Sequence, residues 1–291
     1  MRPENTGWFE MPSPFQTEMG RVLMLEPPWS DADALREQLL DATYGKPFVI
    51  DDGELRYLYF SISLMQSAMR LKTPNTLELR YTQKMMGFLL FNPRPKRIVL
   101  IGLGGGSLIK FCYHRLPATH ITAIEIDPHV LALREAFLLP PDDERLQTLQ
   151  ADGAEHLEQT EKGIDVLLLD AFDKTGFAPG LANRDFLESA HAKLSGSGIL
   201  VINLAGGRDS YEGLIDLVLE VFDHQALLLP VPKDGNNVLF AFKERNFEPR
   251  WRWLHNYAKE LKAKFGLDFP MFVQKLERSA KVGLTYREAA R

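Results

Sequence analysis

Four acidic side chains follow short apolar segments of the sequence, at positions where each could bind part of a substrate. They are Glu125, Asp152, Asp170 and Asp173. A carboxylate accepts hydrogen bonds, so one such group can hold ribose hydroxyls and another an adenine amino group. A pair of carboxylates can bind a cationic amine and take its proton. These residue types predict a nucleoside site beside an amine site.

A glycine-rich loop follows the apolar segment 97–101 and contains Gly102, Gly104, Gly105 and Gly106. Glycines allow a sharp turn from a strand into a helix and let the backbone approach a ligand closely. The loop lacks the third glycine of the dinucleotide fingerprint, and a tight structural turn is the alternative interpretation. Its place between an apolar segment and a helical one favours a nucleotide site.

The spacing of the acidic residues supports that interpretation. Glu125 lies 20 positions after Gly105, about where an acidic residue accepts hydrogen bonds from a ribose. Asp152 is followed by Gly153 and has two compatible interpretations, an adenine contact and an N-cap of a helix over 154–159. These residues predict an adenosine-containing ligand, bound without a metal.

Asp170 and Asp173 stand where a second substrate would lie. Asp170 directly follows the most apolar segment, 164–169, and Asp173 comes three positions later in a loop that contains glycine and proline. Ligands of a parallel α/β sheet bind beyond the carboxyl ends of its strands. The alternative is that both aspartates only cap or order the loop.

The pattern around these residues predicts an α/β fold of Rossmann type, like that of S-adenosylmethionine-dependent methyltransferases. Short apolar segments alternate with helical ones, which is typical of a parallel sheet covered on both faces. The segments 225–231 and 238–243 flank turn residues and predict a terminal antiparallel hairpin. The predicted parallel strands are 97–101, 120–126, 146–150, 164–169 and 198–203.

Three parts are predicted along the chain. Residues 1–92 form a small N-terminal region, in which 48–50 and 55–60 flank Asp51-Asp52-Gly53 as a β-hairpin and Leu77 begins an amphipathic helix. Residues 93–248 form the Rossmann-like catalytic domain. Residues 249–291 form a helical tail that packs against the protein or against a second copy.

Composition narrows the function further. The 291 residues carry a formal charge of −5, which gives no support to nucleic-acid binding. One cysteine, Cys112, excludes an intrachain disulfide and fits a reducing, cytoplasmic location. The seven histidines lack metal-ligand spacing, and no apolar stretch long enough to cross a membrane is present. The first 20 residues do not have the pattern of a signal peptide.

Together these segments resemble the spermidine/spermine synthase family, the polyamine aminopropyltransferases, over about residues 48–243. The resemblance implies a methyltransferase-like Rossmann domain behind a small β-rich N-terminal domain, in a homodimer. It also implies that decarboxylated S-adenosylmethionine donates an aminopropyl group to an amine such as putrescine.

The resemblance also assigns roles to residues. Asp170 would accept the proton, Asp173 and Tyr81 would bind the amine, and Gln66 would bind the donor. The remaining donor-binding positions implied by the resemblance are Gly102, Gly104, Gly105, Gly106, Glu125, Asp152 and Gly153.

The sequence departs from the family pattern on the amine side. Gly105 stands where the family has an aspartate that meets the donor's amine, so a counter-charge is missing. An acidic pair before the tyrosine is also missing: Glu78 could substitute for it, whereas Arg80 would repel a polyamine. Lys174, after the second aspartate, adds another cation.

Two other functions therefore stay open. Because Gly105 has no side chain, backbone N–H groups there can donate hydrogen bonds to the carboxylate of ordinary S-adenosylmethionine. This favours methyl transfer to an unknown acceptor. A non-catalytic nucleoside-binding scaffold is the third possibility, because a fold alone does not fix a function.

Overall fold

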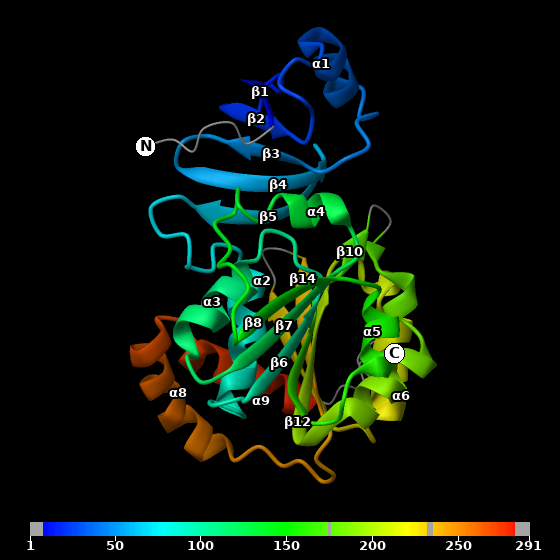
Figure 1. Ribbon diagram of the computed structural model, residues 1–291. Coiled ribbons are helices and arrows are strands. Elements are labelled where there is room, and N and C mark those ends of the chain that lie inside the picture. Colours follow the sequence, from blue (N-terminus) through cyan, green and yellow to red (C-terminus); the bar gives the residue numbers. More distant parts are fainter. Residues whose placement is uncertain (1–7, 174–175, 232–234, 283–291) are drawn as a thin grey trace. The chain divides into compact units, whose positions relative to one another are not determined.

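The computed structural model describes residues 8–173, 176–231 and 235–282, and the chain divides into two compact units (Figure 1). The first unit consists of Met1–Leu79, Leu103–Phe111 and Asp127–Pro141. The second unit consists of Arg80–Gly102, Cys112–Ile126 and Asp142–Arg291. The domain boundaries that the sequence predicts, after residues 92 and 248, stay a prediction.

The second unit is built on a seven-stranded mixed sheet, in the order β13-β14-β12-β9-β6-β7-β8. The five strands from β12 to β8 are parallel, and β13 and β14 form an antiparallel hairpin at one edge. The predicted α/β fold with a terminal hairpin is therefore confirmed. The strands are β6 (Arg97–Ile101), β7 (His120–Glu125), β8 (Leu146–Gln150), β9 (Ile164–Leu169), β12 (Leu194–Leu204), β13 (Ala226–Val231) and β14 (Asn236–Phe242).

Helices cover both faces of this sheet (Figure 1). On one face lie α5 (Gly153–Gln159), α6 (Arg184–Lys193) and α7 (Glu212–Val221). On the other face lie α2 (Arg80–Met85), α8 (Trp251–Phe265) and α9 (Phe269–Val282). Shorter elements are η1 (Met86–Leu90), η2 (Pro179–Leu181), η3 (Arg208–Ser210), β10 (Phe172–Asp173) and β11 (Gly176–Phe177).

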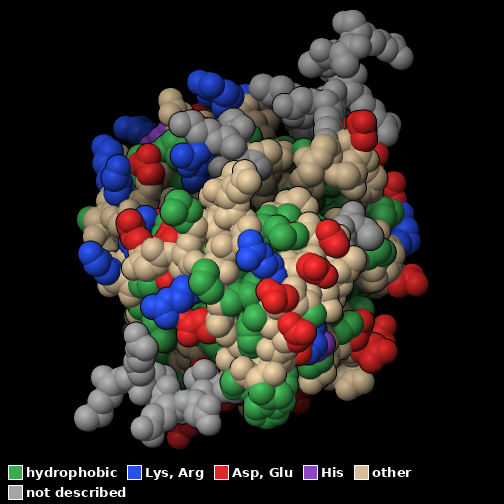
Figure 2. Space-filling view, turned by 90° about the horizontal axis from the view of Figure 1, so that it is seen from above, with side chains coloured by type: hydrophobic (Ala, Val, Ile, Leu, Met, Phe, Trp, Pro, Cys, Tyr) green, Lys and Arg blue, Asp and Glu red, His purple; other side chains and the backbone are tan. Residues whose placement is uncertain are grey.

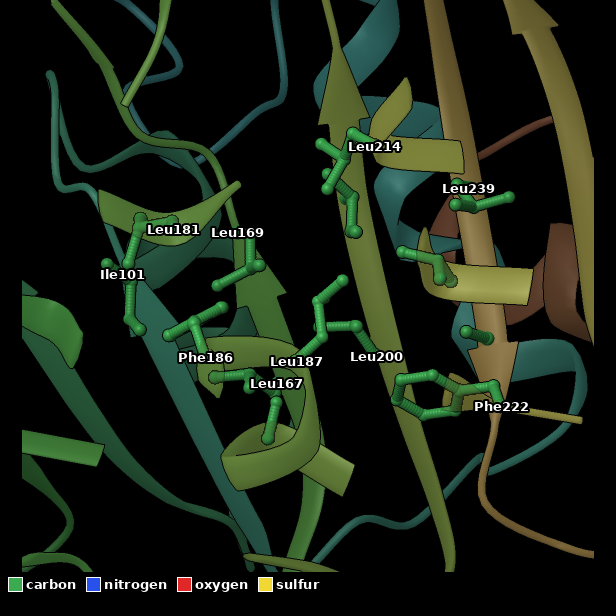
Figure 3. Packing of buried hydrophobic residues seen from close by; sticks show 14 of the residues in the cluster. Ile101, Leu167, Leu169, Leu181, Phe186, Leu187, Leu200, Leu214, Phe222 and Leu239 are labelled. Atoms are coloured by element: carbon green, nitrogen blue, oxygen red, sulfur yellow. The ribbon is translucent and has the colours of Figure 1, made fainter. Parts of the chain in front are cut away.

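The central strands β6 and β9 are mainly apolar because both faces of the sheet are buried there. Leu167 and Leu169 of β9 pack with Phe186 and Leu187 of α6 in a continuous cluster (Figure 3). Val166 and the other alternate residues of β9 point to the opposite face and are buried as well. Burial of apolar surface stabilises this layered arrangement and fixes the register of the strand ends, where the acidic residues lie.

The first unit holds an antiparallel sheet of five strands, in the order β1-β2-β3-β4-β5. The sequence also predicts a short strand over 21–25, which is β2, besides the hairpin of β3 and β4. The sheet agrees with the β-rich N-terminal domain that the resemblance implies, whereas β1 and β5 were not predicted individually. The elements are β1 (Phe9–Pro12), β2 (Arg21–Met24), α1 (Ala32–Leu40), β3 (Phe48–Asp51), β4 (Leu55–Ser61), β5 (Leu64–Arg70) and α4 (Pro128–Ala132). Helix α3 (Ser107–Arg115) starts in this unit.

Two helix boundaries differ from the sequence prediction. The helix predicted from Leu77 begins at Arg80, and it continues after Met85 as a 3₁₀ helix. Glu78 lies outside it, in an ion pair with Arg70 at 2.5 Å. The tail forms two helices, because Gly266 in the left-handed conformation ends α8 and a second amphipathic segment follows.

The described surface mixes charges of both signs. On the face seen in Figure 2, basic and acidic side chains occur together among hydrophobic ones.

Within the described ranges, no helix is long and apolar enough to cross a membrane.

Candidate functional site

The carboxyl ends of β6 and β9 meet at one edge of the second unit's sheet. The backbone N–H of Gly102 donates to the carbonyl of Ile124 at 2.9 Å, and that of Asp170 donates to the carbonyl of Ile101 at 3.0 Å. The sheet therefore places Gly102 and Asp170 side by side, at the point where the strand order reverses. Ligands of open α/β sheets bind at this point.

Gly102 is required by this close approach. Its φ is +92°, and a Cβ atom there would lie 2.3 Å from the carbonyl oxygen of Asp170. We expect Gly102→Ala to lower the free energy of unfolding by about 2 kcal/mol or more, from backbone strain plus overlap. Urea unfolding would measure it, with Gly163→Ala as the control, because Gly163 has φ +105° and open space around it. Equal losses in the two variants would contradict the role of the overlap.

The Asp170 carboxylate is held on both oxygens. Its Oδ1 accepts from the Asn203 amide at 2.8 Å, and its Oδ2 accepts from the Tyr81 hydroxyl at 3.2 Å. Tyr81 lies on α2, 89 positions away in sequence, and Asn203 lies on the neighbouring strand β12. The two bonds fix the orientation of the carboxyl group.

Burial changes the acidity of Asp170. Desolvation raises its pKa from 3.8 to about 6, and the hydrogen bonds from Asn203 and Tyr81 partly oppose this rise because they favour the charged form. The carboxyl group is therefore mostly ionised at pH 7 and able to take up a proton. A group with this property is suited to general base catalysis.

A second amide supports the first. Asn203 is 2 % exposed, and its Oδ1 accepts from the side-chain amide of Asn236 at 2.9 Å. This bond orients the Asn203 amide so that its Nδ2 points to Asp170. The chain Asn236–Asn203–Asp170 joins the terminal hairpin to the edge of the sheet.

Glu125 and Asp152 lie farther along the same edge. Glu125 is the last residue of β7, and its half-buried side chain is followed by the exposed side chain of Ile126. Asp152 caps α5, because its Oδ1 accepts from the N–H groups of Ala154 at 2.8 Å and Glu155 at 3.1 Å. The predicted cap is confirmed. Since both bonds use one oxygen, the other oxygen can accept from a ligand.

Gly153 has a packing role. It is buried, and a Cβ atom there would lie 2.4 Å from Cγ2 of Ile101. The glycine lets the start of α5 approach the end of β6, which brings Asp152 close to the edge of the sheet.

The remaining glycines of the loop and Gln66 belong to the first unit. Gly104 and Gly106 have φ values of +51° and +66°, which turn the chain into α3. Gln66 lies half-buried on β5, next to Ser67, and Ser67 contacts the turn at Gly105. The loop and the predicted donor-binding glutamine are thus parts of one compact unit.

The basic and acidic residues of the predicted amine side are only partly described. The side chain of Asp173 and the whole of Lys174 lie outside the described residues. Arg80 is exposed at the start of α2. The Glu78 carboxylate accepts hydrogen bonds from the Arg70 guanidinium, and its part in replacing the missing acidic pair stays a prediction.

Other chemistries find no support among the described residues. Cys112 is buried, and its burial raises the pKa of the thiol to about 12, so the reactive thiolate does not form. In the part of the chain that the structure describes, no group of three or more His, Cys, Asp or Glu side chains is placed to hold a metal ion.

Sequence reasoning missed Asn203, Asn236 and Ser67 as candidate site residues. The sequence pattern could have identified Asn203, because it is a polar residue near the end of an apolar segment. Asn236 and Ser67 carried none, because their significance comes from contacts between segments far apart in sequence. Ile126 was also missed. Its exposed apolar side chain directly follows Glu125, and such a side chain is suited to pack against a base.

The geometry supports a defined chemistry. The sheet edge combines the carboxylates of Glu125 and Asp152, at the ends of neighbouring strands, with an oriented and mostly ionised carboxylate at Asp170. A transfer reaction that removes a proton from its nucleophile needs these two functions.

Comparison with known proteins gives the same result. Residues 78–205 match the family defined by the spermine/spermidine synthase domain. A polyamine aminopropyltransferase of Chromobacterium violaceum is 35% identical over 232 residues, which cover 79% of this chain and 89% of the relative.

Solved structures share the fold. A probable spermidine synthase from Corynebacterium glutamicum superposes with a TM-score of 0.63 at 18% identity, covering 79% of this chain and 91% of that one. Human methyltransferase-like protein 13, in complex with SAH, gives 0.55 at 21% identity, covering 70% and 93%. At these identities the structures establish the fold alone.

Proposed function

The chain belongs to the spermine/spermidine synthase family of polyamine aminopropyltransferases, and from this we propose that it transfers an aminopropyl group from decarboxylated S-adenosylmethionine to an amine. The observation that carries the proposal is the Asp170 carboxylate, which is held by Tyr81 and Asn203 and has a pKa of about 6. The product would be a longer polyamine.

The proposed step is a direct displacement at carbon. The nitrogen lone pair of a neutral amine attacks the aminopropyl carbon bonded to the sulfonium sulfur. The C–N bond forms as the C–S bond breaks, and the sulfur leaves as the neutral thioether of 5′-methylthioadenosine. Asp170 accepts the proton that the amine nitrogen loses. Alignment of the two substrates supplies much of the rate.

The donor's adenosine would lie along the carboxyl edge of the sheet. We assign the ribose hydroxyls to Glu125 and the adenine amino group to the second oxygen of Asp152. The turn that begins at Gly102 would contact the chain beyond the sulfur, and Gln66 keeps the donor-binding role that the resemblance to the family implies. Support comes from the placement of Glu125 and Asp152 at neighbouring strand ends and from the glycine turn that precedes α3.

The amine site is proposed around Asp170. Tyr81 contacts the Asp170 carboxylate, which places its ring beside the proton acceptor. Asp173 follows three positions later and is assigned to the second ammonium group of the amine. We further propose that the protein is cytoplasmic and forms a homodimer, as the resemblance to the family implies.

The pH dependence of the reaction tests the Asp170 environment. We expect kcat/KM, referred to the concentration of neutral amine, to fall about tenfold per pH unit below pH 6, because protonation of Asp170 (pKa about 6) removes the base. Asn203→Ala removes a hydrogen bond that favours the charged form, so this acid limb should move upward by about one pH unit. Asn237→Ala is the control, since its amide bonds Tyr211 instead. An unmoved limb in Asn203→Ala would contradict the role of this bond.

Binding of the two donors tests the proposed function. Calorimetry would compare decarboxylated S-adenosylmethionine with S-adenosylmethionine on the full chain. Tighter binding of the decarboxylated form is the expected result. Binding of neither would overturn the nucleoside site at Glu125 and Asp152.

One observation favours a second candidate, methyl transfer from S-adenosylmethionine. Gly105 provides no carboxylate, and nearby atoms leave no room for one. The carboxylate of ordinary S-adenosylmethionine would therefore meet no repulsion there. Tighter binding of this donor would direct the search to methyl acceptors.

A further inference from the structure

Three polar side chains stand on neighbouring strands of the second unit's sheet. The parallel register of β9 and β12 puts Asn203 beside Asp170. In the antiparallel pair of β12 and β14, Asn203 lies opposite Val238, and Asn236 precedes Val238 by two positions. Because side chains alternate between the two faces of a strand, Asn236 shares a face with Asn203 as its diagonal neighbour. The register of the sheet therefore brings the three side chains together.

The hydrogen bonds among these side chains run in one direction. Nδ2 of Asn236 donates to Oδ1 of Asn203 at 2.9 Å, and Nδ2 of Asn203 donates to Oδ1 of Asp170 at 2.8 Å. Half a rotation of the Asn203 amide would exchange its donor and its acceptor, and its carbonyl oxygen would then face the carboxylate. Asn203 is buried, so an oxygen turned away from Asn236 would lose its hydrogen bond. The donor on Asn236 thus favours the orientation in which Asn203 donates to Asp170.

Hydrogen-bond donors reach the Asp170 carboxylate from two elements. Tyr81 of α2 donates to Oδ2, and Asn203 of β12 donates to Oδ1. Burial raises the pKa of this carboxyl group, and the two donors oppose the rise. Among the described residues, these are the side chains that shift it, and of the two Tyr81 is titratable and Asn203 is neutral. The orientation of the Asn203 amide therefore decides whether one of these donors is present.

We propose that Asn236 is a positioning residue for the reaction, because it holds the Asn203 amide with its N–H directed at the proton acceptor Asp170. The inference rests on the proposed function, in which Asp170 takes the proton of the amine. It gives the terminal hairpin, which supplies Asn236, a part in the chemistry that is exerted through Asn203.

The next residue of the hairpin provides a matched control. Asn237 lies opposite Leu204 and points to the other face of the sheet, where its amide donates to the Tyr211 hydroxyl at 2.7 Å. It has the same side chain as Asn236 and the same half-buried setting at the start of β14. It lies outside the chain of bonds that leads to Asp170.

The test follows the titration of the Asp170 carboxyl carbon by NMR, on the full-length protein without substrates. Its signal is assigned by its absence from Asp170→Asn. Asn236→Ala removes the donor that fixes Asn203, so the titration midpoint should move upward by about half a pH unit. Asn203→Ala should move it by about one pH unit. Adding Asn236→Ala to Asn203→Ala should change nothing more, because the two residues act in series.

Kinetics provides the second readout. In Asn236→Ala the acid limb of kcat/KM, referred to the concentration of neutral amine, should move with the NMR midpoint. The kcat well above this limb should equal that of the unaltered protein, because Asp170 is ionised in both. Asn237→Ala should leave the midpoint and the limb unmoved.

The outcomes separate this inference from the proposed function. An unmoved midpoint in Asn236→Ala, or an equal shift in Asn237→Ala, would overturn the inference. Shifts that add in the double variant would also overturn it, because Asn236 would then act independently of Asn203. Each of these results leaves aminopropyl transfer standing. Absence of transfer by the unaltered protein would overturn the proposed function, and with it the catalytic meaning of a midpoint that still moves as expected.

Discussion

Asp170→Asn is expected to lower kcat by about 100-fold to 10,000-fold, the range associated with loss of a general base. The amide of asparagine has the size of the carboxyl group but cannot accept the proton from the amine. Burial already disfavours the charge of Asp170, as its raised pKa shows, so the neutral variant should remain folded. Donor affinity should be unchanged, because the assigned contacts of the adenosine lie on other strands.

The measurement is the rate of 5′-methylthioadenosine formation under saturating donor and amine. Asp185→Asn is a matched control, since Asp185 is exposed in the first turn of α6. Its kcat should equal that of the unaltered protein. A kcat for Asp170→Asn within a few-fold of the unaltered protein would show that Asp170 is not the base.

Glu125→Gln is expected to weaken the binding of adenosine-containing ligands by about 30-fold, or roughly 2 kcal/mol. An ionised carboxylate accepts two strong hydrogen bonds from the two ribose hydroxyls, whereas an amide offers one acceptor oxygen. Because the loss falls on the nucleoside, it should be the same for the donor and for 5′-methylthioadenosine. The kcat at saturating donor should change little.

Calorimetry with both compounds would check this prediction. Glu158→Gln provides the matched control, because Glu158 is an exposed residue of α5 away from the strand ends. A Glu125→Gln variant that binds both compounds as tightly as the control would remove Glu125 from the site.

Much of the second unit could be predicted because its strands are buried on both faces. Such strands appear in the sequence as continuous apolar segments, and 164–169 is the strongest of them. The polar residue that ends such a segment must lie at the carboxyl edge, so Asp170 could be placed without the structure. Asp152 follows the weaker segment 146–150 and was placed from its position before Gly153 and a helical segment.

The first unit was harder to predict. Its short strands β1 and β2 combine buried and exposed residues, and β5 carries the polar residues Gln66 and Ser67 at its centre. An antiparallel sheet depends on pairing between segments that need not be adjacent in sequence, and local patterns do not reveal such pairing. The second tail helix, α9, was missed because only the stripe of α8 was recognised.

The parts of the site that were missed depend on long-range contacts. Asn203 and Tyr81 reach Asp170 from two other elements, and Asn236 orients Asn203 from the terminal hairpin. The sequence identified Gly105 as the loss of a charge. The structure shows why a side chain does not fit at position 105: Ser67 and Phe137 occupy the space that its Cβ atom would need.

The most direct test of aminopropyl transfer is turnover by the full-length protein supplied with decarboxylated S-adenosylmethionine and a panel of diamines and polyamines. Mass spectrometry would follow both products, with S-adenosylmethionine as the parallel donor. We expect 5′-methylthioadenosine and an amine lengthened by one aminopropyl unit, in equal amounts, from the decarboxylated donor. Formation of S-adenosylhomocysteine and a methylated product from S-adenosylmethionine, with no aminopropyl transfer to any amine, would contradict it.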